Sequence, residues 1–147
     1  MEVALREAER GAEQGEVPVG AVVVRGGIVI AHAHNETVRR KDPTAHAELL
    51  AIQRALEAVE TDRLLDASLF VTLEPCAMCA GAAVVAKVGR LVYGTYDEKS
   101  GMCGSLADLV RHPRLNHRLE VIPGVLADRA AALLRSFFDA RRNPPEA

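Results

Sequence analysis

The sequence SLFVTLEPCAMC, which runs from Ser68 to Cys79, decides the fold. Its first six residues form an apolar run with a β-branched centre, which is typical of a buried strand. Pro75 then indicates the start of a helix over residues 76–86, because its missing N–H would be unpaired there anyway. Cys76 and Cys79 are three residues apart, so this helix presents both thiols on one side. The stretch therefore predicts a strand followed by a helix that carries paired thiols.

Strand and helix patterns alternate on both sides of this stretch. The expected strands are Val19–Val24, Ile28–His34, Ser68–Leu73, Leu91–Gly94 and Glu120–Ile122. The expected helices cover residues 2–14, 45–59, 76–86, 105–111 and 127–142. Gly26-Gly27 joins the first two strands and signals a hairpin, whereas the later strands are joined through helices and can run parallel. No linker divides the chain, so we expect residues 1–147 to form a single α/β domain with helices on both faces of its sheet.

Composition narrows the class of protein. No apolar run approaches the length that spans a membrane, and the charged N-terminus shows no signal peptide. The three cysteines, an odd number, do not suggest a disulfide framework, so we expect a reducing cytoplasm and a metal-binding use for paired cysteines. Residues 1–86 carry 8 basic and 13 acidic side chains and residues 87–147 carry 10 and 7, so an anionic partner would favour the C-terminal half. The net charge of −2 taken alone indicates an ordinary mixed surface.

A second segment, Asp42-Pro43-Thr44-Ala45-His46-Ala47-Glu48, also signals a helix start. His46, Cys76 and Cys79 would then lie at helix N-termini, where partial positive charge favours the metal-binding thiolate. One histidine and two thiolates make three protein ligands, whereas zinc prefers four. An open fourth position is the mark of a catalytic site, at which zinc acidifies a water molecule. Glu48, two residues from His46, is placed to move the protons.

Each piece alone permits other interpretations. A lone Cys-x-x-Cys is equally compatible with a redox pair or half of a structural zinc knuckle. A lone His-Ala-Glu on a helix is commonly a packed or surface residue. In this order and spacing, however, His-x-Glu followed by Pro-Cys-x-x-Cys is the signature of zinc-dependent deaminases.

At this point a family resemblance is visible over nearly the whole chain. The two catalytic segments, residues 42–48 and 73–82, match bacterial tRNA-specific adenosine deaminases of the cytidine-deaminase superfamily. Further segments that resemble this family are residues 17–22, 101–106, 112–117, 124–128 and 137–142. The resemblance implies a three-layer α/β/α sandwich around a five-stranded mixed sheet, one Zn²⁺ per chain and a homodimer. It also implies hydrolysis of adenosine to inosine at the wobble position of a tRNA anticodon, with the arginine tRNA reading ACG as the expected partner.

The resemblance also implies roles for particular residues. Glu48 would be the catalytic proton shuttle, taking a proton from the attacking water and delivering it toward adenine N1 and then the departing ammonia. Asn35 would hydrogen-bond the purine edge, although position alone favours a turn residue that ends a strand. Val19 would form an apolar wall of the base pocket, and the backbone of Ala47 would contact the base. The expected tRNA contacts are Asp97, Lys99, Phe138 and Arg142; for Phe138, core packing is an equal alternative.

Two further questions concern a third cysteine and the substrate. Cys103 as a fourth ligand would close the site and leave Glu48 with no water to activate, so we expect an inert, partly buried thiol. The same zinc motif also serves deaminases of a free base or nucleoside such as cytosine or guanine, and this remains the alternative function. A non-enzymatic zinc-stabilised domain would leave Glu48 without a role.

Overall fold

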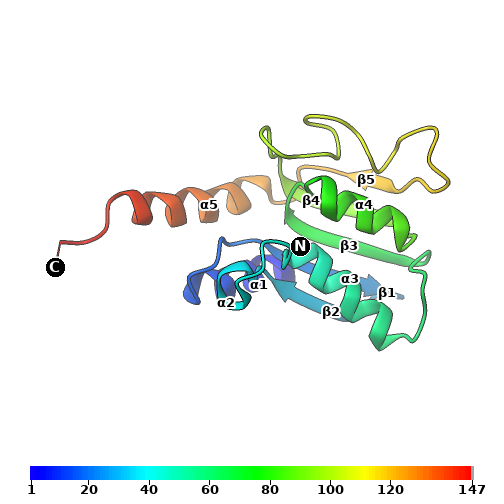
Figure 1. The fold of residues 1–147 in the computed structure, drawn as a ribbon, viewed down its shortest axis with the longest axis horizontal. Coiled ribbons are helices and arrows are strands. Elements are labelled where there is room, and N and C mark those ends of the chain that lie inside the picture. Colours follow the sequence, from blue (N-terminus) through cyan, green and yellow to red (C-terminus); the bar gives the residue numbers. More distant parts are fainter. Residues whose placement is uncertain (147) are drawn as a thin grey trace.

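The computed structural model describes residues 1–146, and a five-stranded sheet runs through its centre (Figure 1). The strands are β1 (Gly20–Arg25), β2 (Ile28–His34), β3 (Ala67–Leu73), β4 (Arg90–Thr95) and β5 (Glu120–Ile122), and their order in the sheet is β2-β1-β3-β4-β5. β1 is antiparallel to both β2 and β3, whereas β3, β4 and β5 run parallel to one another. The hairpin and the parallel crossovers expected from the sequence are therefore confirmed.

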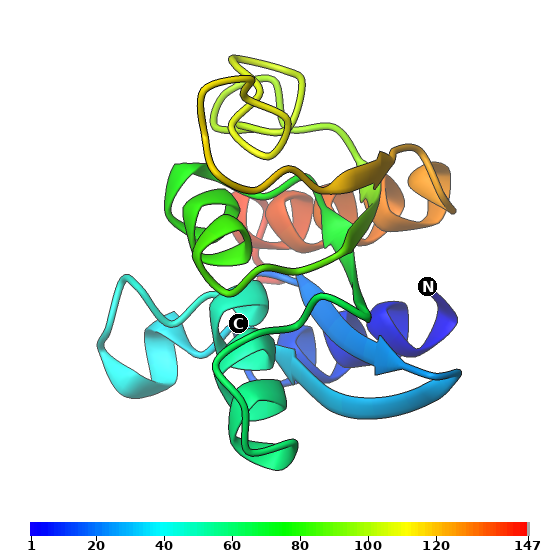
Figure 2. The same cartoon turned by 90° about the vertical axis from the view of Figure 1, so that its right-hand side faces the viewer.

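Helices cover both faces of this sheet. α1 (Glu2–Glu13) and α5 (Ala127–Arg142) pack together on one face, and α3 (Ala47–Ala58) and α4 (Ala77–Val85) on the other, as Figure 2 shows. The short α2 (Thr37–Arg40) follows β2. The three-layer α/β/α sandwich with a mixed sheet is thus confirmed. None of the helices in residues 1–146 combines the length and the apolar character needed to cross a membrane.

The parallel and antiparallel pairings bring four chain segments to one edge of the sheet. β3 and β4 are parallel, so their carboxyl ends meet at this edge. β1 is antiparallel to β3, which puts its first residue there, and β2 returns antiparallel to β1 and ends beside it. Open α/β sheets place their ligand sites beyond the carboxyl ends of parallel strands. The candidate site therefore belongs at this edge.

The expected helix over residues 105–111 is wrong. Although Ser105-Leu106-Ala107-Asp108-Leu109-Val110-Arg111 has helical composition, the segment follows an irregular path that includes an isolated bridge between Cys103 and Asp108. The N–H groups of Cys103 and Ser105 donate to the buried carboxylate of Glu74 instead of starting a helix. Contacts far apart in the sequence thus override the local helical preference.

The first helix approaches the sheet through a glycine. Gly20 opens β1, and a Cβ built at this position would lie 1.9 Å from the carbonyl oxygen of Ala4 and 2.6 Å from the amide nitrogen of Ala8. Both atoms belong to the backbone of α1, which cannot yield as a flexible side chain would. The packing of α1 against β1 therefore requires glycine at this position.

We expect Gly20→Ala to lower the free energy of unfolding by roughly 1–3 kcal/mol, because the added methyl group forces α1 away from the sheet. Urea unfolding followed by circular dichroism measures this change. Gly81→Ala on α4 is the matched control, since a Cβ there meets nothing within 4 Å and alanine is the better helix former. Equal stability of Gly20→Ala and the parent protein would contradict the close packing.

Candidate active site

Three potential metal ligands meet at the starts of two helices. His46 is the N-cap residue of α3 and Cys76 that of α4, and neither uses its side chain to cap its helix. Nδ1 of His46 lies 3.6 Å from Sγ of Cys76 and 3.7 Å from Sγ of Cys79. Ligands bound to one tetrahedral zinc ion at about 2.1 Å (nitrogen) and 2.3 Å (sulfur) would lie about 3.6 Å apart. The spacing therefore fits zinc.

The electrostatics of the two thiols are also compatible with a bound cation. A hydrogen bond with Cys79, followed by one with His46, lowers the pKa of Cys76 to about 3. The same hydrogen bond to Cys76, together with burial, raises the pKa of Cys79. Without a cation only one of the two thiols ionises, because two buried thiolates would repel each other. A metal ion removes this conflict, and His46, Cys76 and Cys79 are the only group in residues 1–146 with metal-ligand spacing.

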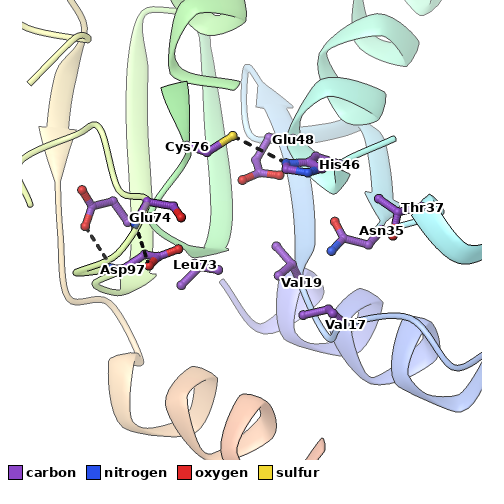
Figure 3. Close-up of a pocket in the computed structure, with 11 residues that line it drawn as sticks. Val17, Val19, Asn35, Thr37, His46, Glu48, Leu73, Glu74, Cys76 and Asp97 are labelled. Carbon is purple, nitrogen blue, oxygen red and sulfur yellow. Dashed lines mark hydrogen bonds between the residues drawn. The ribbon is translucent and has the colours of Figure 1, made fainter. Parts of the chain in front are cut away.

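The carboxylate of Glu48 lies beside this centre. Glu48 is in the first turn of α3, is only 4 % exposed, and points into the same cavity as His46 and Cys76 (Figure 3). Burial raises its pKa to about 7. A carboxyl group with a pKa near neutrality can both accept and release a proton, as a general acid–base catalyst must.

A cavity of about 290 Å³ opens over the metal ligands. Val19 forms part of its apolar wall and Asn35 part of its polar wall. The side-chain Oδ1 of Asn35 accepts a hydrogen bond of 2.9 Å from the N–H of Ala47. Ala47 is fully buried and does not line the cavity, so its expected contact with a base stays a prediction, while its N–H fixes the amide of Asn35.

The expected tRNA contacts divide into two groups. Asp97 lines the cavity, and Asp97, Lys99 and Phe138 line an adjoining groove of about 770 Å³. Phe138 is 43 % exposed, so it is a surface residue of this groove and not part of the core. Arg142 lines neither space and instead forms an ion pair with Asp139 on its own helix. Its contact with tRNA stays a prediction.

Sequence reasoning missed several residues of the site. Thr37, Glu74 and Ser100 also line the cavity, and Tyr96 and Leu134 line the groove. Glu74 could have been found from the sequence. It directly follows a buried strand and precedes the Cys-x-x-Cys pair, and a charged side chain that is buried there needs hydrogen-bond partners. The others lie on α2, on the loop after β4 and on α5, and only the tertiary structure brings them to this edge.

Cys103 lies outside the ligand group, as expected. It is fully buried, and its thiol donates a hydrogen bond to the carbonyl oxygen of Pro75. Burial raises the pKa of this thiol, which keeps it protonated and unreactive. The group that could hold a metal ion thus consists of His46, Cys76 and Cys79 without Cys103.

Comparison with known proteins gives the family. The family model of MafB19-like deaminases matches residues 1–142. The tRNA-specific adenosine deaminase of Bacillus subtilis (strain 168) is 45% identical over 147 residues, which is 100% of this chain and 91% of the relative. The chain belongs to the tRNA-specific adenosine deaminases. The corresponding protein of Aquifex aeolicus (strain VF5) is 44% identical to this deaminase, over 97% of this chain and 94% of its own length.

Solved structures agree with this placement. One from a study of A-to-I editing by tRNA:A34 deaminases has a TM-score of 0.87 and 44% identity to this deaminase, and the match covers 91% of this chain and 97% of that chain. The fold also resembles a guanine deaminase from Nitrosomonas europaea, with a TM-score of 0.80 and 26% identity over 92% of this chain and 81% of that one. The fold is therefore shared with deaminases that act on other bases.

We expect the purified deaminase to hold about one zinc ion per chain, and Cys76→Ala to lose most of it, because removal of one ligand leaves only two. Inductively coupled plasma mass spectrometry of dialysed protein measures the zinc content. Cys103→Ala is the matched control and should keep its zinc. Loss of zinc from Cys103→Ala, or full retention by Cys76→Ala, would show that the ligand set is different.

Proposed function

We propose that this deaminase hydrolyses adenosine to inosine at the wobble position of a tRNA anticodon, with one Zn²⁺ per chain and the arginine tRNA reading ACG as substrate. The observation that carries the proposal is the position of Glu48. This buried carboxyl group, with a pKa near 7, lies beside a three-ligand centre in a cavity that opens into a groove. Membership of the family supports the choice of adenosine in tRNA.

The ligands and Glu48 have separate tasks. His46, Cys76 and Cys79 would hold Zn²⁺, which when bound lowers the pKa of water toward neutrality and so supplies a nucleophile. Glu48 takes a proton from the attacking water as a C–O bond forms at C6 of adenine. It passes this proton to N1. It then takes the remaining proton of the water from the oxygen now bound to C6 and delivers it to the amino group, which leaves as ammonia when the C6–N bond breaks. The carbonyl group of inosine remains at C6, and Glu48 is returned to its starting state.

The walls of the cavity orient the base. The Oδ1 atom of Asn35 is already engaged by Ala47, which leaves the amide N–H groups free to donate to an acceptor on the purine edge. Val17 and Val19 present apolar surface to the flat face of the base. A fixed amide beside an apolar wall holds C6 in one orientation toward the metal centre, which is how positioning lowers the barrier.

The adjoining groove fits the nucleotides that flank the target base. A base in an anticodon loop must be splayed out of its stack to enter the cavity. Tyr96 and Phe138, which are 53 % and 43 % exposed, offer aromatic faces on which neighbouring bases can stack. Lys99 lines the same groove and adds a positive charge for phosphate.

Because the proposed substrate is a tRNA, we also infer that the enzyme acts in the cytoplasm, and the family resemblance implies a homodimer.

Glu48→Gln should keep its zinc and lose about 10²–10⁴-fold in kcat, because glutamine has the shape of glutamate but cannot carry the proton. Inosine formation under single-turnover conditions measures the rate, and zinc content is determined on the same sample. Glu57→Gln on the exposed side of α3 is the matched control. A normal rate for Glu48→Gln would remove the proton shuttle from the mechanism.

The substrate itself is tested by incubating the protein with an ACG-anticodon arginine tRNA and sequencing for inosine. We expect conversion at the wobble position alone, since the groove binds nucleotides on either side of the target. Free adenosine, cytosine and guanine, assayed in parallel by ammonia release, should react far more slowly. Turnover of guanine or cytosine together with unconverted tRNA would favour a deaminase of free bases.

A further inference from the structure

The side chain of Glu74, which follows β3, holds the loop after β4. Glu74 is 1 % exposed, and its Oε1 accepts hydrogen bonds from the N–H of Asp97 at 3.1 Å and from the hydroxyl of Ser105. Its Oε2 accepts from the N–H groups of Cys103 at 3.1 Å and Ser105 at 3.0 Å. Both oxygens therefore act only as acceptors, and they join the beginning and the end of the segment from Asp97 to Ser105, called here the substrate loop.

The substrate loop closes tightly around this carboxylate. A Cβ built at Gly101 would lie 2.3 Å from Cδ of Glu74 and 2.4 Å from its Oε2, so the loop backbone comes nearer than any other residue type would allow. The N–H of Met102 also donates to the carbonyl oxygen of Pro75 at 2.9 Å. The loop is thus attached to the two residues that directly precede the metal ligand Cys76.

Glu74 acts on the cavity through Asp97. While Glu74 accepts from the Asp97 N–H, the carboxylate of Asp97 accepts from the N–H of Ser100 at 3.1 Å (Figure 3). The same carboxylate oxygen also accepts from the N–H of Lys99 at 3.1 Å. Asp97 and Ser100 line the cavity over the metal centre, and Lys99 lines the groove beside it. The carboxylate of Glu74 thus holds Asp97, and the carboxylate of Asp97 holds Lys99 and Ser100. Together they fix where the walls of the substrate site lie relative to the metal ligands.

We propose that Glu74 is a positioning residue for substrate binding, which locks the substrate loop to the start of the metal-binding helix and so sets affinity for the polynucleotide. The proposal rests on the proposed function, because the loop lines the groove assigned to flanking nucleotides. Glu74 contacts neither the metal ligands' side chains nor Glu48 in the hydrogen-bond network, so its task is separate from the proton shuttle.

The decisive experiment is steady-state deamination of a tRNA by Glu74→Gln. Glutamine puts an NH₂ group where the carboxylate has a second acceptor. Even if the Ser105 hydroxyl turns to accept from this NH₂ group, at least one of the three backbone N–H donors of the loop is left without an acceptor. We expect KM to rise about tenfold or more with kcat within about threefold of the parent, because an interaction that is weakened equally in the bound state and in the transition state changes KM alone. Zinc content should be unchanged, and Glu57→Gln is again the matched control.

A merely structural role gives a different result. A destabilised variant contains fewer active molecules, which lowers the apparent kcat and leaves KM as it was. An unchanged KM for Glu74→Gln, whatever its kcat, would therefore overturn the proposal. This failure is distinct from failure of the proposed function, in which the parent protein itself would not deaminate the tRNA.

Gly101→Ala tests the same contact by changing the loop residue instead of Glu74. It replaces the first variant in the experiment if Glu74→Gln does not fold. Its added methyl group displaces the substrate loop from Glu74 without changing any hydrogen-bonding group, and we expect the same rise in KM. In the double variant the KM should be no higher than in the worse single variant, because both changes break one contact. Independent, multiplying effects on KM would show that the two residues do not act through each other.

Discussion

Two thiols and an imidazole are held within 4.8 Å of one another at the starts of α3 and α4, although two neighbouring thiolates repel each other. This arrangement is a constraint on the rest of the fold. It requires both helices to lie on the same face of the sheet with their N-termini at the same edge. It also requires the extended backbone of the two N-cap residues, which directs His46 and Cys76 toward each other instead of into their own helices.

Buried carboxylates complete this edge of the sheet, and their surroundings give them different tasks. Glu48 receives no hydrogen bond that offsets its burial fully, so its pKa rises to about 7 and it can exchange a proton. Glu74 is also buried, but hydrogen bonds from Ser105, Asp97 and Cys103 outweigh the effect of burial and lower its pKa. Glu16 accepts from the N–H groups of Val38 and Arg39 and so fixes α2 beside Asn35. Glutamate thus provides the proposed proton carrier, Glu48, and two structural anchors, Glu74 and Glu16.

Much of the fold could be predicted because its elements have strong local signals. The hairpin through Gly26-Gly27 and the strand-to-helix passage at Pro75 follow from turn chemistry and apolar runs. Pro75 itself lies just before the N-cap and not inside the helix. The failure over residues 105–111 has a specific cause, since the partner that holds Cys103 and Ser105 is Glu74, about 30 residues earlier in the chain.

The sequence by itself determined the chemistry of the centre, because ligand type, spacing and position at a helix start are local properties of His46, Glu48, Cys76 and Cys79. The tertiary structure decided what surrounds it. The pairing of β1, β3 and β4 brings Val19, the end of β3 and Asp97 to one cavity, and α5 places Phe138 at the adjoining groove while Arg142 stays outside it. Such neighbours depend on strand order and long-range hydrogen bonds, which no short segment of sequence encodes.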